Sequence, residues 1–151
     1  MLGAGGTAQA VLLALHTLGL ERCTVLVRDP GRTGELLATA QRCALDIELG
    51  TLSPRAAALD ADLVVSTLPP GAADPLVGRG WSGEQAVLDV VYAPWPTPLA
   101  AAVRAAGGTV VSGALMLLHQ AARQVELMTG RPAPLAAMRG ALQAAAPGCG
   151  G

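Results

Sequence analysis

The sequence contains no lysine and no phenylalanine, whereas alanine, glycine, arginine and proline are abundant. Without lysine, this chain cannot supply a lysine acid or base, which restricts every catalytic mechanism. The cysteines Cys23, Cys43 and Cys149 are odd in number and widely spaced, and they form no CxxC pair. We therefore expect free, buried thiols in a reducing compartment, and neither a disulfide framework nor a zinc site. No cluster of His, Cys and carboxylates has the spacing of metal ligands, so no metal is expected.

Strong charge and long apolar runs are also missing. A formal net charge of −1 gives no reason to expect nucleic acid or an anionic membrane as a partner. No apolar run reaches the length needed to span a bilayer, and Met1 is followed by a glycine turn in place of a signal-peptide core. We therefore expect a cytoplasmic protein. Its 151 residues, 52% of them apolar, suffice for one domain with a substantial core.

Short apolar runs alternate along the chain with longer helical patterns. This alternation predicts an α/β fold, namely a doubly wound, Rossmann-type, mostly parallel sheet with helices on both faces. The expected strands are Thr24–Val27, Ile47–Leu49, Leu63–Thr67, Val87–Val91 and Thr109–Ser112. The expected helices are Thr7–Leu18, Thr33–Cys43, Ser53–Leu59, Pro98–Ala106, Leu115–Met128 and Leu135–Ala145. The last two are more than the sheet needs to cover itself, so one of them is a candidate for docking on something beyond this domain.

Residues 3–8 fit the pattern G-x-G-x-x-G/A that is typical of dinucleotide-binding turns. The first glycine allows a tight turn, the second lets the backbone approach a pyrophosphate, and Ala8 keeps the helix close to the strand. The start of that helix adds unpaired N–H groups and a favourable dipole. A purely structural turn is the alternative. The residues predicted to hold the pyrophosphate are Gly3, Ala4, Gly5, Gly6 and Thr7.

Only Met1 and Leu2 precede this turn, whereas a strand normally has about five residues. The first strand of a Rossmann sheet is central and therefore not dispensable. We expect a sequence that is cut on its amino side. The remainder is expected to form one NADP-binding domain over residues 1–146, with a frayed tail at residues 147–151.

The end of the second expected strand of the sheet indicates the choice of cofactor. An acidic residue there accepts a hydrogen bond from the ribose of NAD, whereas arginine pairs with the 2′-phosphate of NADP. Arg28 and Arg32 flank Asp29 here, and Asp29 is also suited to cap a helix that starts at Pro30. We therefore predict NADP, with a solvated surface turn as the alternative.

Four motifs occur in order along the chain and resemble the cofactor domain of shikimate dehydrogenases. They are the glycine turn, S-T-L-P at residues 66–69, D-V-V-Y-x-P-x-x-T-P-L at residues 89–99 and G-x-x-M-L-x-x-Q-A at residues 113–121. The similarity covers nearly the whole chain, and the last two motifs are the most specific. The resemblance implies reduction of 3-dehydroshikimate to shikimate with hydride from NADPH.

The resemblance also assigns roles to single residues. Ser66 and Thr67 would lie under the nicotinamide ribose, and Val90 and Gly113 would flank the nicotinamide. Tyr92 and Gln120 would contact the substrate. In the family a lysine and an aspartate that handle the carbonyl proton belong to an amino-terminal domain, so no catalytic residue is assigned to this chain. The implied partner is a small-molecule substrate shared with that missing domain, and a homodimer stays open.

The residues alone support less specific interpretations. Tyr92 follows a strand at the edge where open α/β sheets bind ligands, or it is a half-buried rim aromatic beside Pro94. Gln120 either binds a partner or is simply exposed. His16 lies in the first helix far from the turn, and His119 points about 100° away from Gln120, so neither is predicted to be a general base.

Three hypotheses therefore remain open from the sequence. The first is the NADP-binding half of a shikimate dehydrogenase, inactive by itself. The second is a fragment of an NAD-preferring quinate/shikimate dehydrogenase. The third is a non-catalytic nucleotide-binding regulatory module, against which the retention of Tyr92 and Gln120 argues, because a pure cofactor sensor needs no substrate contacts.

Overall fold

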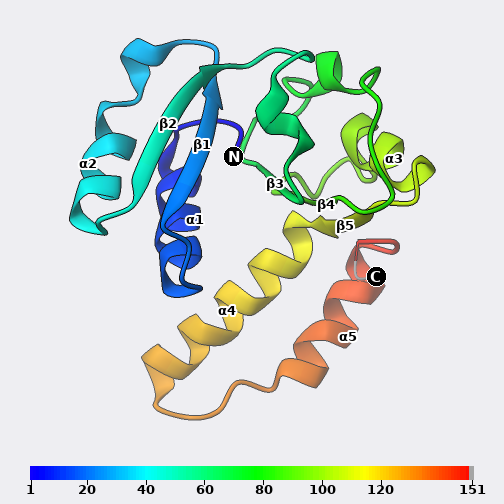
Figure 1. Cartoon of the computed structure of the whole chain (residues 1–151). Helices are drawn as coiled ribbons and strands as arrows, with labels where there is room; N and C mark the ends of the chain where they lie inside the picture. Colours follow the sequence, from blue (N-terminus) through cyan, green and yellow to red (C-terminus); the bar gives the residue numbers. More distant parts are fainter. Residues whose placement is uncertain (150–151) are drawn as a thin grey trace.

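The computed structural model describes residues 1–149 and shows helices alternating with parallel strands (Figure 1). This confirms the predicted α/β class. In chain order the helices and strands are α1 (Gly6–Thr17), β1 (Arg22–Val27), α2 (Gly34–Arg42), β2 (Asp46–Thr51), β3 (Leu63–Ser66), β4 (Ala86–Asp89), α3 (Pro98–Ala105), β5 (Thr109–Ser112), α4 (Gly113–Thr129) and α5 (Leu135–Ala145). Short 3-10 turns lie at Pro30–Arg32, Ala57–Asp60 and Asp74–Leu76. No helix within residues 1–149 is both long and apolar enough to cross a membrane.

The sheet consists of two parallel parts that Leu2 joins. β1 pairs with β2, and β3, β4 and β5 pair in that order. Leu2 bridges Leu26 of β1 and Ser66 of β3. Its N–H donates to Val65 O at 2.8 Å, and its carbonyl accepts from the Thr67 amide at 2.9 Å. The spatial order β2, β1, Leu2, β3, β4, β5 is the doubly wound arrangement, and the glycine turn lies at its switch point.

Both faces of the sheet are covered at its centre, where strands such as β3 are largely apolar and buried, whereas the edge strand β2 carries Asp46 and Glu48 and has no buried residue. Successive side chains of a strand point to opposite faces. Accordingly, Val25 and Val27 of β1 pack in one buried cluster with side chains from α1 and α2. Leu26 lies in the other cluster, together with Leu2 and Leu99 of α3.

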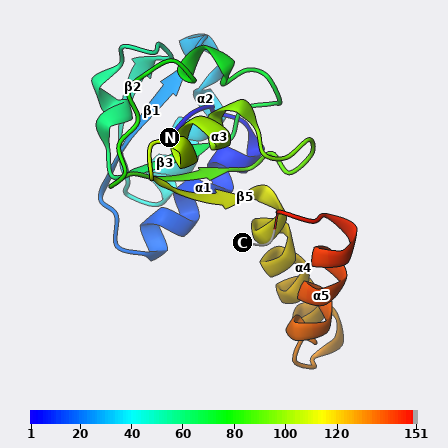
Figure 2. The same cartoon turned by 90° about the vertical axis from the view of Figure 1, so that its right-hand side faces the viewer.

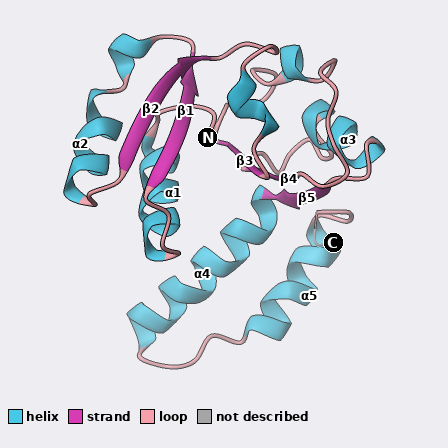
Figure 3. Cartoon of the chain, viewed as in Figure 1, coloured by secondary structure: helices cyan, strands magenta, loops and turns pink. Residues whose placement is uncertain are grey.

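The helices α4 and α5 form a hairpin that extends away from the sheet (Figures 1 and 2). In Figure 3 this hairpin consists of helix and loop and meets the sheet at β5, which leads directly into α4. α4 ends at Thr129 and is followed by the C-cap Gly130, whose positive φ of 66° is typical of a helix-terminating glycine. The buried residues of α4 lie in its first part, from Gly113 to Ala122, and α5 has none. Most of the hairpin therefore contributes nothing to the core.

One prediction of local structure differs from the structure. The helix expected over Ser53–Leu59 is wrong, because the segment forms only turns and the short 3-10 turn at Ala57–Asp60. Only Leu59 of that turn is buried, and so short a segment gains too little from burial to nucleate a helix. Within the tail expected to be frayed, Cys149 is buried and its carbonyl accepts a hydrogen bond from the Ser112 hydroxyl. Residues 150–151 lie outside the described residues.

Candidate functional site

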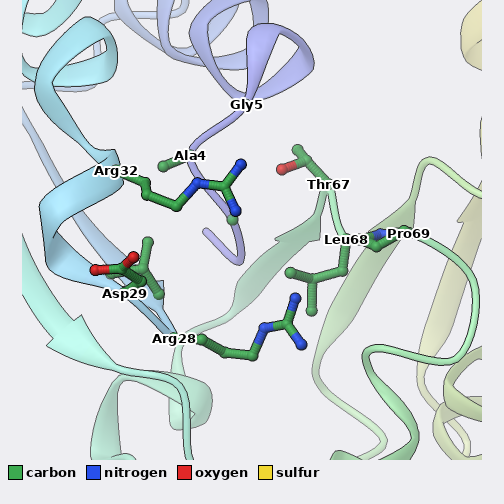
Figure 4. Close-up of a pocket in the computed structure, with 10 residues that line it drawn as sticks. Ala4, Gly5, Arg28, Asp29, Arg32, Thr67, Leu68 and Pro69 are labelled. Atoms are coloured by element: carbon green, nitrogen blue, oxygen red, sulfur yellow. The ribbon is translucent and has the colours of Figure 1, made fainter.

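A cavity of about 530 Å³ opens at the carboxyl ends of β1 and β3 (Figure 4). Open α/β sheets bind ligands at this edge, at the switch point in strand order. The cavity combines the glycine turn, the end of β1 and the segment that follows β3. It is lined by Gly3, Ala4, Gly5, Val27, Arg28, Asp29, Arg32, Thr67, Leu68 and Pro69.

The glycine turn contains two glycines that are required for different reasons. Gly3 has a φ of +94°, and a Cβ there would lie 2.7 Å from Thr67 Oγ1. Thr67 Oγ1 in turn donates to Leu2 O at 2.8 Å and so fixes the turn to β3. Gly5 has an ordinary extended conformation, and a Cβ there would meet no atom within 4 Å. The fold therefore explains Gly3 but not Gly5, whose missing side chain only keeps the cavity open.

α1 begins at the edge of the same cavity, which Gly5 lines. Gly5 is the N-cap of α1, and no side chain caps the helix there. Gly6 and Thr7 are the first two residues of α1 and are exposed, but they line neither this cavity nor the one beside β4. The first amides of a helix have no partner within it, so these N–H groups and the helix dipole favour an anion at this position.

Two positive side chains extend into the cavity from the end of β1. Figure 4 shows the guanidinium groups of Arg28 and Arg32 reaching toward the side of the cavity formed by Thr67 and Leu68. Both arginines are exposed. Among residues 1–149, neither forms an ion pair. Two unneutralised guanidinium groups beside a helix amino end are suited to a ligand with more than one phosphate.

Asp29 lies between these arginines but turns its carboxylate toward its own backbone. Its Oδ1 accepts from the Gly31 amide at 2.9 Å and caps the 3-10 turn that begins at Pro30. In Figure 4 the carboxylate points away from the cavity. The residue therefore contributes backbone to the wall, and its side chain plays the capping role that the sequence offered as an alternative.

A second cavity of about 450 Å³ adjoins the first toward β4. The two share Thr67, Leu68 and Pro69, so they lie side by side along the edge of the sheet, and we call them together the trough. We call them the β1 end and the β4 end of the trough. The far wall of the β4 end is the loop after β4, which contributes Val90, Val91, Tyr92 and Ala93. Tyr92 is 51% exposed, so its ring is accessible to a ligand.

The structure does not bring every predicted site residue into the trough. Ser66 is fully buried, and its hydroxyl is the one buried side-chain polar atom without a hydrogen-bond partner among the described residues. Gly113 is buried behind Val90, where a Cβ would lie 1.9 Å from Val90 O. Gln120 is exposed on α4 and lines neither cavity.

Asp89 lies directly before Val90 of the β4 end, lines neither cavity and was not predicted as a site residue from the sequence. It ends β4, is 2% exposed and accepts hydrogen bonds from the Val91 amide at 3.3 Å and from the Thr97 hydroxyl at 2.7 Å. Burial raises the pKa of Asp89, while the hydrogen bonds from Thr97 and from the Val91 amide act in the opposite direction. The motif of residues 89–99 contains both Asp89 and Thr97, but a motif does not show that their side chains meet.

The fold and the trough together define a Rossmann-type nucleotide-binding domain. Two curated relatives are shikimate dehydrogenases (NADP(+)). The relative from Moorella thermoacetica is 37% identical over 147 residues, covering 91% of this chain and 50% of the relative. The relative from Halobacterium salinarum is 38% identical over 148 residues, covering 95% and 54%. The chain therefore spans about half the length of the curated relatives it matches.

The model of the family described as "Shikimate 5'-dehydrogenase C-terminal domain" matches residues 113–143. Among solved structures, the Mycobacterium tuberculosis shikimate dehydrogenase is 40% identical with a TM-score of 0.79, covering 95% of this chain and 55% of that one. The Thermus thermophilus enzyme, solved with NADP(H) and shikimate, is 32% identical with a TM-score of 0.72 and covers 95% and 53%. A quinate dehydrogenase from Corynebacterium glutamicum, solved with NAD, is 30% identical with a TM-score of 0.77 and covers 95% and 53%. The chain belongs to the shikimate dehydrogenase family and corresponds to its C-terminal part.

Proposed function

We propose that this chain is the NADP(H)-binding half of a shikimate dehydrogenase, which interconverts 3-dehydroshikimate and shikimate. The observation that carries the proposal is the trough, in which an uncapped helix start and two unpaired arginines face the same space. The pyrophosphate would lie on the amides of residues 3–7, and the adenosine 2′-phosphate between Arg28 and Arg32. The nicotinamide would reach the β4 end, beside Val90 and Tyr92.

In this proposal the cofactor supplies hydride, and the chain binds and orients it. Thr67 fixes the turn through its hydrogen bond to Leu2 O. Tyr92 presents a phenol to the substrate from the wall of the β4 end. The chain contains no lysine, so the acid or base that the resemblance assigns to lysine would belong to another part of the enzyme. We therefore expect the isolated chain to bind NADP without measurable oxidation of shikimate.

The α4–α5 hairpin supports an arrangement in two halves. Met128 at the end of α4 is 85% exposed, and no residue of α5 is buried. Apolar helix faces that cover nothing are typical of interfaces. We propose that the hairpin packs against the substrate-binding half and so brings Gln120 toward the shared substrate. A cytoplasmic location and a role in aromatic amino-acid biosynthesis follow from the proposed activity, and the free thiols of Cys23, Cys43 and Cys149 are compatible with that compartment.

The test is a titration of NADP and NAD against the wild-type chain and two variants, Arg28→Ala and Arg32→Ala. A charge-assisted hydrogen bond contributes about 1.5–3 kcal/mol, so each variant should weaken NADP roughly 10- to 150-fold. NAD lacks the 2′-phosphate and should change by less than about threefold. Arg22→Ala is the matched control, because it removes an exposed arginine at the opposite end of β1 and should leave both affinities unchanged.

The second candidate is an NAD-preferring quinate/shikimate dehydrogenase half, which the similarity to the NAD-bound quinate dehydrogenase favours. The same titration separates the two candidates. Equal affinities for NAD and NADP, with no effect of Arg28→Ala, would support the NAD-preferring enzyme and refute the phosphate site.

A further inference from the structure

The loop between β4 and α3, residues 90–97, forms the wall of the β4 end of the trough. Within it Val91 and Thr97 are buried, and the half-buried Trp95 packs against the core. Tyr92 and both neighbouring prolines, Pro94 and Pro96, are exposed. A loop with few buried side chains is expected to be mobile unless other contacts hold it. Trp95 holds the middle of the loop, and its indole N–H donates to Gly148 O at 3.1 Å, so the two ends depend on other hydrogen bonds.

Both ends of this loop are bound to one carboxylate. Asp89 Oδ1 accepts from the Val91 amide at 3.3 Å, next to the start of the loop. Asp89 Oδ2 accepts from Thr97 Oγ1 at 2.7 Å, where the loop ends. The same Thr97 oxygen accepts from the Ala100 amide at 3.0 Å and caps α3. Asp89 thus links the end of β4, the loop and the start of α3.

The surroundings of Asp89 contain hydroxyls and no cation. Ser66 of β3 and Ser112 of β5 lie opposite Asp89 in the strand register. Within residues 1–149, Asp89 forms no ion pair. Burying a carboxylate without a counter-charge is costly, so a core that only needed filling would favour an apolar residue here. A carboxylate must supply something that an apolar side chain cannot.

The carboxylate of Asp89 accepts hydrogen bonds on both of its oxygens. The Val91 amide and the Thr97 hydroxyl are both donors, and an ionised carboxylate accepts on both of its oxygens. Asparagine has one acceptor oxygen and one NH₂ group. In one orientation its NH₂ would face the Val91 N–H, and in the other it would leave the Thr97 hydroxyl hydrogen without an acceptor. An amide of the same shape therefore cannot hold both ends of the loop.

We propose that Asp89 is a positioning residue whose two oxygens hold residues 90–97 in the conformation that presents Val90 and Tyr92 to the nicotinamide end of the cofactor. This inference rests on the proposed function. It predicts that loss of the double hydrogen bond impairs the β4 end of the trough and leaves the β1 end intact, because Arg28, Arg32 and the glycine turn have no contact with Asp89.

The experiment compares two ligands that report on different ends of the trough. Adenosine 2′,5′-bisphosphate reaches only the β1 end, whereas NADP extends to the β4 end. We expect Asp89→Asn and Thr97→Val to weaken NADP by roughly tenfold while the bisphosphate changes less than about twofold. Thr97→Ser keeps the hydroxyl and should restore NADP binding. The double variant should bind NADP no more weakly than either single variant, because both remove the same contact.

Thr39→Val is the matched control for a lost buried hydroxyl. Thr39 is as buried as Asp89, and its hydroxyl donates to Glu35 O of α2 and to Gln9 Oε1 of α1 instead of to the loop. Its substitution should leave the ratio of the two affinities unchanged. Amide hydrogen exchange at Val91 should accelerate in Asp89→Asn and Thr97→Val but not in Thr39→Val, which would tie the effect to the loop.

The outcomes separate this inference from the proposed function. If the wild-type chain bound neither ligand, the proposed function would fail, and this inference with it. If the wild type bound both, the inference would be overturned by equal weakening of both ligands in Asp89→Asn, or by a folded variant with unchanged NADP affinity. Should Asp89→Asn not fold, Thr97→Val and Thr97→Ser decide in the same way.

Discussion

Gly5 offers a substitution in which folding and binding are expected to respond independently. Its backbone is extended, with φ of −80° and ψ of −171°, and a Cβ there would meet no atom within 4 Å. Alanine is a poorer N-cap residue than glycine, so Gly5→Ala should lower the free energy of unfolding by about 0.5–1 kcal/mol. Alanine also lowers the conformational entropy of the unfolded chain, which should raise the free energy of unfolding by about 0.4–1 kcal/mol. The free energy of unfolding should therefore change by less than about 0.5 kcal/mol, which shifts Tm by at most about 2 °C.

Binding should respond strongly to the same methyl group. Gly5 lines the β1 end of the trough, so the methyl would displace a pyrophosphate from the amides at the start of α1. Each charge-assisted hydrogen bond lost costs about 1.5–3 kcal/mol, so NADP affinity should fall roughly 10- to 150-fold or more. Calorimetric titration and thermal unfolding of one sample measure both quantities.

Gly3→Ala is the matched comparison, because it adds the same methyl group two residues earlier. The positive φ and the 2.7 Å approach to Thr67 Oγ1 should lower its free energy of unfolding by about 1–3 kcal/mol. A Gly5→Ala variant that bound NADP within about twofold of wild type would contradict a pyrophosphate site at Gly5. Instability of Gly5→Ala, and not of Gly3→Ala, would likewise contradict the different roles of the two glycines.

Two further predictions concern stability. Gly113→Ala should lower the free energy of unfolding in urea by about 2 kcal/mol or more, because its Cβ would lie 1.9 Å from Val90 O. The Cβ of Gly140→Ala in α5 would meet no atom within 4 Å, so this variant should raise the free energy of unfolding by about 0.5–1 kcal/mol. Similar effects of the two variants would contradict the close packing of Gly113 against Val90. The raised pKa of Asp89 means that the native state holds its proton more tightly than the unfolded chain does. The free energy of unfolding of wild type minus that of Asp89→Asn should therefore increase as pH falls from neutral toward the ordinary value of 3.8, and a difference that stayed constant or decreased would contradict the burial of this carboxyl.

Elements with a strong local pattern were predicted from the sequence. The apolar runs around Val25, Val64 and Val87 lie in strands because each is covered on both faces. The segment Ser53–Leu59 was assigned wrongly, because a short pattern with one buried leucine does not determine a helix. Tertiary contacts decide such segments, and the sequence does not show them.

In the candidate site, too, residues with a local role could be predicted and residues held by tertiary contacts could not. The turn around Gly3 and the arginines after β1 could be predicted, because glycine and arginine have local roles that do not depend on strand register. The contact between Asp89 and Thr97 could not, since it requires a turn of the loop that brings α3 back over β4. The burial of Ser66 depends likewise on its position between two neighbouring strands.

The β1 end of the trough is lined from several elements and the β4 end is more open, and under the proposed function the two ends would serve cofactor and substrate differently. At the β1 end, the glycine turn, the start of α1 and two arginines approach one cavity from different elements, all within this chain. At the β4 end, Tyr92 is half exposed on one of the two walls, and Gln120 lines neither cavity. A small hydroxylated ring in so open a site would exchange most of its hydrogen bonds with water, so this chain alone should bind it with little selectivity. We therefore infer that affinity for the cofactor resides in this chain, whereas selectivity for the substrate requires a second surface that covers Tyr92.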